Sequence, residues 1–303
     1  MRTLEIHWFY YIFHPSFPLF GLSFNSVTRL VLSENIFQTF QDLRRFISSF
    51  TSLNDLTLNN VNWLSDGFRL SQNSLSCFPR SRNLRLQYLS IFVTPADVRN
   101  LMVWLSSTAT ESSLIITTLR FGPLPFPEEQ SSHPPLDAIE VSNFLRKVSR
   151  LSHISIGFDY FFHLIGDDIC LPWTQLTTLT VHQIHYNNCS RVSSLLGTLQ
   201  DLGKLQELTL RFHSTSSISP QMPFANADDY IPWHALDTVL SEDPFQNLRS
   251  IYISIRFFSK SSFGDNSEEE RQEERRFFPK LFQRINPSGS KFFVFSPYDT
   301  CDE

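Results

Sequence analysis

The chain has 303 residues, a formal net charge of −5 and a sequence pI near 6.0. A general nucleic-acid binder needs a basic face, and this charge balance gives no support for one, so we expect no nucleic-acid partner. The four cysteines are widely scattered, which favours a reducing compartment, cytoplasmic or nuclear, over a disulfide framework. At this length the chain is either two ordinary domains or one solenoid, which lengthens by adding units.

The first 21 residues are apolar enough to raise the question of a signal peptide or membrane anchor. Against this, Glu5 sits where a positive region belongs, the apolar run 8–13 is short, and Pro15 and Pro18 break the stretch after it. We therefore expect no membrane contact, and a strand at residues 4–6 that leads into a loop. Because the sequence opens directly on a strand, we also expect further residues upstream.

Residues 26–63 contain the unit that the rest of the chain repeats. Side-chain alternation predicts short strands at residues 30–32 and 56–58, and apolar residues at i, i+3, i+4 and i+7 predict a helix over residues 38–50. The helical stripe consists of Leu43, Phe46, Ile47 and Phe50. So small a unit cannot close its own core, which predicts stacked copies.

The strand pattern recurs along the chain with a spacing of mostly about 25–35 residues, close to that of leucine-rich repeats. The strand signatures begin at Leu4, Leu30, Leu56, Leu89, Leu119, Ile154, Leu179, Leu208 and Ile251. A leucine precedes many of them by three residues, at Leu53, Leu86, Leu151, Leu176, Leu205 and Leu248. The result is L-x-x-L-x-L, the strand pattern of those repeats.

The helical stripe recurs as well, at residues 98–105, 141–148 and 192–199, with a shorter version at 236–240. Thr94 is a candidate N-cap with Pro95 at the first helical position, and Ser190 is a candidate cap further on. Strands that alternate with helices at this spacing predict parallel pairing. The expected fold is therefore α/β, a leucine-rich-repeat solenoid with a curved parallel sheet on the concave side and helices on the convex side.

We expect the solenoid to span residues 1–256 and a capping segment to span 257–303. The capping segment is predicted to contain a charged helix at 268–282 and a last strand at 291–295. Irregular stretches at 65–83, 122–135 and 213–232 are predicted to be exposed loops, either tolerated surface variation or part of a binding rim.

The phrase VTRLVLSENIFQTFQDLRRFISSFTSLNDLTLNNVNW resembles the irregular leucine-rich repeats of fungal F-box proteins. The resemblance to leucine-rich repeats covers about residues 4–255. In the F-box family a short F-box docks to a cullin-type ubiquitin ligase and the repeats hold the substrate. No leucine-proline opening with a three-helix segment precedes Leu4, so the F-box itself is not found. The resemblance therefore implies ligase docking only if an F-box precedes Met1 in the full gene.

One cluster suggests chemistry: Cys170, His182, His185 and Cys189. Zinc needs four soft or imidazole ligands that converge, but Cys170 has no partner two to four residues away. Polar loop histidines are the simpler interpretation, and a hydrolase or metal enzyme using this region is the alternative function. No nucleophile elbow and no phosphate-binding glycine motif occurs in the sequence, so we expect no catalytic residues and no cofactor.

The remaining candidate site is the surface that the fold would create. In L-x-x-L-x-L, residues beside the inward leucines face the concave side, where a rigid sheet holds side chains ready for a partner. The predicted partner-binding strip comprises Arg29, Asp55, Tyr88, Arg120, His153, His182, Glu207, Arg211 and Tyr252. These residues predict a non-enzymatic, monomeric protein-binding module, and the resemblance to F-box proteins implies that this module is the substrate-recognition part of a ubiquitin-ligase adaptor. A truncated copy without function is the remaining alternative.

Overall fold

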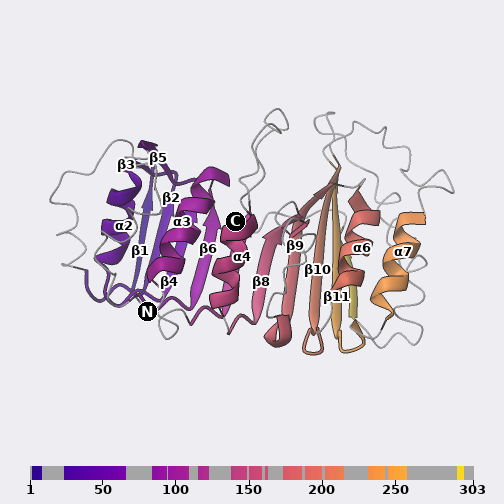
Figure 1. Cartoon of the computed structure of the whole chain (residues 1–303). Coiled ribbons are helices and arrows are strands. Elements are labelled where there is room, and N and C mark those ends of the chain that lie inside the picture. Colours follow the sequence, from indigo (N-terminus) through magenta and orange to yellow (C-terminus); the bar gives the residue numbers. More distant parts are fainter. Residues whose placement is uncertain are drawn as a thin grey trace. The chain divides into compact units, whose positions relative to one another are not determined.

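The computed structural model describes residues 2–8, 24–65, 84–93, 95–108, 115–122, 138–148, 150–158, 161–162, 173–185, 188–199, 202–214, 231–242, 245–257 and 292–296. The chain divides into two compact units, unit one (Met1–Leu151) and unit two (Ser152–Glu303). Both units are α/β with parallel strands, and each is described by itself (Figure 1). The predicted loops at 65–83, 122–135 and 213–232 lie almost entirely outside the described residues, as does the predicted charged helix at 268–282.

Unit one contains one sheet of five described strands, a second sheet of two, and three described helices. The first sheet has the order β1 (Thr3–His7), β2 (Arg29–Ser33), β4 (Asp55–Asn59), β6 (Tyr88–Phe92) and β7 (Thr118–Gly122). The second pairs β3 (Ile36–Thr39) with β5 (Asn62–Ser65), and the helices are α2 (Phe40–Ser48), α3 (Pro95–Thr108) and α4 (Ala138–Lys147). The helices lie on one face of the first sheet (Figure 1).

The register of this sheet aligns the predicted strand signatures in two rows. Leu4, Leu30, Leu56, Leu89 and Leu119 are paired from strand to strand in parallel. The second row, two residues further on, is Ile6, Leu32, Leu58, Ile91 and Phe121. From β2 to β7 both rows are fully buried, because alternation places them on the side that the helices cover. The strands predicted in this half of the chain are therefore confirmed.

Unit two contains the second group of described strands. They have the order β8 (His153–Gly157), β9 (Thr178–His185), β10 (Glu207–Ser214), β11 (Ser250–Phe257) and β12 (Phe292–Ser296), all paired in parallel. Its described elements include the helices α6 (Cys189–Thr198) and α7 (Ile231–Leu240) and a 3-10 turn, η3, at Trp173–Gln175. The row Ile154, Leu179, Leu208, Ile251 and Phe293 is again in register. The predicted last strand is present as β12, beside β11.

The entry to the strands repeats one hydrogen-bond arrangement in both units. The backbone N–H groups of Asn54 and Asp55 both donate to the carbonyl of Thr28, at 2.9 and 3.0 Å. Gln87 and Tyr88 do the same to Asn54, and in unit two Gln206 and Glu207 do the same to Thr177. The same pair of bonds therefore joins β4 to β2, β6 to β4 and β10 to β9 just before each ladder begins.

Helix α2 shows why the local sequence folds as it does. Thr39 is extended and caps the helix: its Oγ1 accepts from the Asp42 N–H at 3.2 Å and donates to Asp42 Oδ2 at 2.7 Å. The four residues of the predicted stripe are buried. The ring centroids of Phe46 and Phe50 lie 5.1 Å apart, and the two rings meet edge to face. The ring centroid of Phe40, at the start of the helix, lies 4.9 Å from that of Trp63 in β5. These rings join the helix to the second sheet, which the sequence did not predict.

In unit two, the ring centroids of Phe212 of β10 and Trp233 of α7 lie 5.1 Å apart, so this strand packs against this helix.

Two predictions made for this half of the chain are wrong. Helix α6 begins at Cys189 with Asn188 as its N-cap, so Ser190 lies inside the first turn and does not cap it. His182 and His185 belong to β9 and are not loop residues. No described helix in either unit is long and apolar enough to span a membrane.

Candidate functional site

Within the described residues, no helix covers the second face of the main sheet in either unit, and we call this the helix-free face. It is formed by the residues that alternate with the buried rows. On β2, Arg29 is exposed and Val31 and Ser33 are half-buried, whereas the two leucines between them are buried. The pattern repeats on β4, where Asp55 and Thr57 are half-buried. A parallel ladder holds these side chains at a spacing of about 4.8 Å across strands, so the helix-free face is a fixed array of mostly polar groups.

The four predicted binding residues of unit one all lie on this face. Arg29, Asp55 and Tyr88 occupy the same register position on β2, β4 and β6, so they form one row. Arg120 on β7 is exposed and sits one row further along, opposite Ser90. Ser90 is buried to 3% exposure although it belongs to this face. The row offers charges of both signs beside an aromatic ring, and the structure brings all four residues into two adjacent rows.

The five predicted residues of unit two fall into two groups at opposite ends of the strands. His153 and Glu207 both pair with Thr178, at the start of β8 to β10. Thr178 Oγ1 donates to Glu207 Oε2 at 3.3 Å. Tyr252 comes one row later, opposite Thr209. The second group, His182 and Arg211, lies toward the C-terminal ends of β9 and β10.

At those C-terminal ends the structure adds residues that the sequence did not assign to the site. The His185 ring lies 5.6 Å from the His213 ring, edge to face, and the two residues are register partners. The signal for them was present in the sequence. In LTLRFH the alternating apolar pattern continues past the three-residue signature to Phe212, and in TLTVHQIH an apolar residue returns at Ile184 after a break of one residue. Both patterns indicate strands longer than the ones expected.

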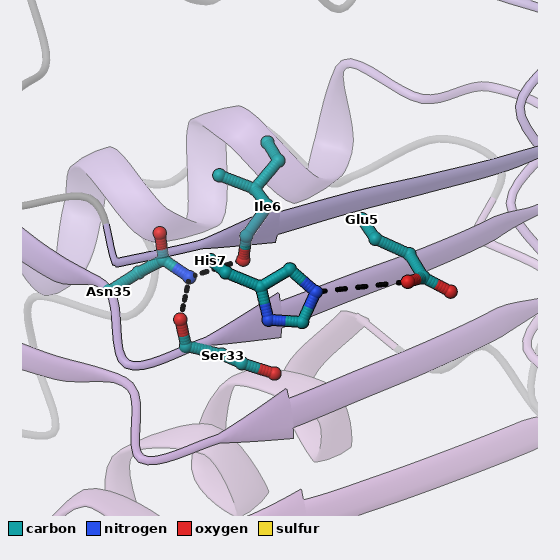
Figure 2. Close-up of polar contacts among 5 residues, drawn as sticks. All are labelled: Glu5, Ile6, His7, Ser33 and Asn35. Atoms are coloured by element: carbon teal, nitrogen blue, oxygen red, sulfur yellow. Dashed lines mark hydrogen bonds and ion pairs between the residues drawn. The ribbon is translucent and has the colours of Figure 1, made fainter.

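The sequence also did not predict the role of Asn35, whose side chain links β1 to β2. Its side chain is 1% exposed, and Nδ2 donates to the backbone carbonyls of Ile6 and Ser33 at 2.8 and 2.9 Å (Figure 2). On the exposed side of β1, His7 Nε2 lies 3.7 Å from Glu5 Oε2, and so exposed a pair adds little stability. Asn35 is the sixth residue of LVLSEN and comes three residues after the second leucine of the strand signature.

The candidate metal cluster gains no support from the described residues. Within them, no group of three or more His, Cys, Asp or Glu side chains is placed to hold a metal ion. Cys170 lies outside the described residues. Cys189 is buried, and desolvation raises the pKa of its thiol from 9.0 to about 12. Because the thiolate is the form that attacks and ligates, this thiol is inert at neutral pH.

Comparison with known proteins gives no family for this chain: no family model matches it, and no curated protein does either.

Proposed function

We propose that this chain is a leucine-rich-repeat solenoid whose helix-free faces bind a protein or peptide partner, and that it catalyses no reaction. The observation that carries the proposal is the parallel, in-register alignment of the L-x-L residues, such as Leu30, Leu56 and Leu89. The recurring pair of backbone bonds at the strand entries supports successive units that share one local arrangement. Asn35 supports it too, because the repeat reserves that position for asparagine or cysteine.

The chemistry of the helix-free face supports binding over catalysis. In unit one, Arg29, Asp55, Tyr88 and Arg120 stand on paired strands, where the backbone is already ordered and little backbone entropy is lost on contact with a partner. Tyrosine and arginine are the residue types that most often carry binding energy at protein interfaces. The proposed ligand is therefore a protein surface or an extended peptide laid across the strands.

We further propose that the chain is the substrate-recognition half of an F-box-type ubiquitin-ligase adaptor. The support is the resemblance of residues 27–63 to fungal F-box proteins, in which the repeats receive the substrate. Affinity purification of the full-length gene product from its native extract tests this step. Recovery of cullin-type ligase subunits is the expected result, and their absence from a preparation that still captures other partners would remove the adaptor role.

Alanine substitution tests the binding proposal. We expect Arg120→Ala and Tyr252→Ala each to weaken partner capture roughly tenfold, because arginine and tyrosine hot spots lose about 1.4 kcal/mol or more on truncation. The thermal midpoints should stay nearly unchanged. Arg45→Ala is the matched control: Arg45 is an exposed arginine on α2, away from the helix-free face. Partner capture that is equal for all three variants in quantitative pull-downs would refute the assignment.

A further inference from the structure

Strand β1 has a partner strand on one side only within the described residues, and that partner is β2. The bonds at the two ends of this ladder show which residues face β2. The carbonyl of Arg2 accepts from the N–H of Arg29 at 3.3 Å, and the N–H of Trp8 donates to the carbonyl of Ser33 at 3.1 Å. Because backbone groups of successive strand residues point to opposite sides, even-numbered residues of β1 face β2. The outward residues are therefore Thr3, Glu5 and His7.

These three outward residues form an open edge of the sheet. Their side chains are exposed, and within the described part of the chain their backbone N–H and C=O groups have no hydrogen-bond partner. Strand β1 contains no proline and no lysine, the residues that commonly block such an edge. A row of unpaired donors and acceptors is a template to which another extended chain can add a strand.

The apolar side of β1 is also incompletely covered. Leu4 and Ile6 begin the two buried rows but are only half-buried, whereas their register partners Leu30 and Leu32 are 0% and 1% exposed. The difference arises because β2 has a neighbouring strand on both sides and β1 has one. Trp8, directly after the strand, is 63% exposed. A strand added at this edge would remove apolar surface of Leu4 and Ile6 from water.

Glu5 gives the edge a negative charge. Its Oε2 lies 3.7 Å from His7 Nε2, and the side chains of Glu5 and His7 are 53% and 49% exposed, so the carboxylate stays accessible (Figure 2). A basic side chain directly opposite Glu5 on an added strand would be favourable. A second copy of this chain fits less well. Antiparallel pairing of all the outward residues of two β1 strands places Glu5 opposite Glu5 of the copy, and like charges in that position are destabilising.

We propose that the open edge of β1 binds an extended segment of a partner protein, which adds a strand with a basic residue opposite Glu5 and apolar residues beside Leu4 and Ile6. The backbone of the edge supplies hydrogen bonds, and side-chain alternation supplies the preference for an apolar–basic–apolar sequence. Strands β2, β4 and β6 separate this edge from Arg120 on β7. The proposal therefore goes beyond the proposed function and does not depend on it.

The test measures binding of a fluorescein-labelled nonapeptide to the full chain by fluorescence anisotropy. In this peptide valine alternates with threonine, and arginine replaces the central threonine. We expect the same peptide with glutamate at its centre to bind at least about fivefold more weakly, because a favourable charge pair with Glu5 becomes a repulsion. Equal affinity for the two peptides would overturn the proposal.

N-methylated peptides distinguish strand pairing from side-chain contact alone. Two versions of the arginine-centred peptide carry N-methyl groups on alternate residues, one on the odd and one on the even positions. Only one of them should lose affinity, roughly tenfold or more, because only alternate N–H groups of an added strand point toward β1. Equal affinity of the two versions would show that the peptide does not pair as a strand. Both peptide comparisons use the wild-type chain and do not depend on any variant folding.

Variants of β1 locate the site. His7→Pro removes an outward N–H and leaves the bonds to β2 in place, so it should weaken binding of the arginine-centred peptide roughly tenfold. His7→Ala is the matched control, because it keeps the N–H, and its affinity should stay within about threefold of wild type. Unchanged affinity in His7→Pro, or equal loss in both variants, contradicts the proposal.

Charge reversal in the protein complements charge reversal in the peptide. Glu5→Lys should bind the glutamate-centred peptide more tightly than the arginine-centred one, since the charge opposite the peptide centre is now positive. Glu242→Lys is the matched control: Glu242 is an exposed glutamate just after α7 in unit two, and its variant should keep the wild-type preference. An unreversed preference in Glu5→Lys places the peptide elsewhere and overturns the proposal.

Other occupants give different results. A wild-type chain that sediments as a dimer, and that His7→Pro converts to a monomer, shows that a second copy occupies the edge. A full-length gene product that binds the peptide at least roughly tenfold more weakly than this chain shows that another segment of the same protein occupies it. Either result overturns the partner assignment. Absence of peptide binding, with partner capture still lost in Arg120→Ala and Tyr252→Ala, overturns the edge proposal and leaves the proposed function standing.

Discussion

Replacing Asn35 by alanine tests whether one buried amide holds β1 to β2. The substitution removes two hydrogen bonds, from Nδ2 to the carbonyls of Ile6 and Ser33. Each such bond contributes about 0.5–1.5 kcal/mol net, so we expect the free energy of unfolding to fall by about 1–3 kcal/mol. The side chain is fully buried, so water cannot easily replace the lost donors.

Two further variants make the reasoning specific. Asn35→Asp keeps the shape but puts a charged acceptor where the two carbonyls need a donor, so it should destabilise more than alanine does. Asn59→Ala is the control: Asn59 ends β4 at the register position of Ser33, but its side chain is exposed. We expect its effect to stay within about 0.5 kcal/mol.

Urea unfolding of the three variants measures these differences, and hydrogen exchange locates them. The amide of Asn62, which donates to the Asn35 carbonyl at 2.9 Å, should exchange faster in Asn35→Ala. A loss below about 0.5 kcal/mol for Asn35→Ala, or an aspartate variant more stable than the alanine variant, would refute the argument from the hydrogen bonds.

Three further predictions concern a helix cap and a buried thiol. Thr39→Ala should cost about 1 kcal/mol in urea unfolding because the Asp42 N–H loses its acceptor, whereas Thr39→Ser should cost little; equal losses would show that the cap is not the cause. In a chain with serine at Cys77, Cys170 and Cys301, Cys189 should resist maleimide at about pH 8 until urea unfolds the protein, since burial raises its pKa to about 12. The same shift should lower folding stability as pH rises from 9.0 towards 12, because only the unfolded chain then loses this proton, and Cys189→Ala should remove this contribution and make the decline with pH shallower. Rapid labelling of the native protein in the same buffer would contradict the burial argument.

The sequence by itself determined the positions of the strands that carry the two buried rows and of the apolar stripe of α2, although it did not predict β3 and β5. The rows through Leu30 and Leu208 and the stripe from Leu43 to Phe50 obey local rules, because alternation and the 3.6-residue period are set within one element. Parallel pairing could be predicted from the alternation of strands with helices, since each return to the sheet needs a crossover. These predictions needed no knowledge of which distant residues meet.

The tertiary structure decided the features that depend on contacts between residues far apart in the sequence. In β9, the bulge at Gln183 is defined by a mismatch of length against β10, so nothing within β9 alone reveals that His182 and His185 share a face. Asn35 donates to a carbonyl 29 residues away, and only the packed sheet supplies it. The face of the sheet was therefore predictable from sequence, whereas the groups gathered at one end of it depend on the register between strands, which is fixed by packing over long range.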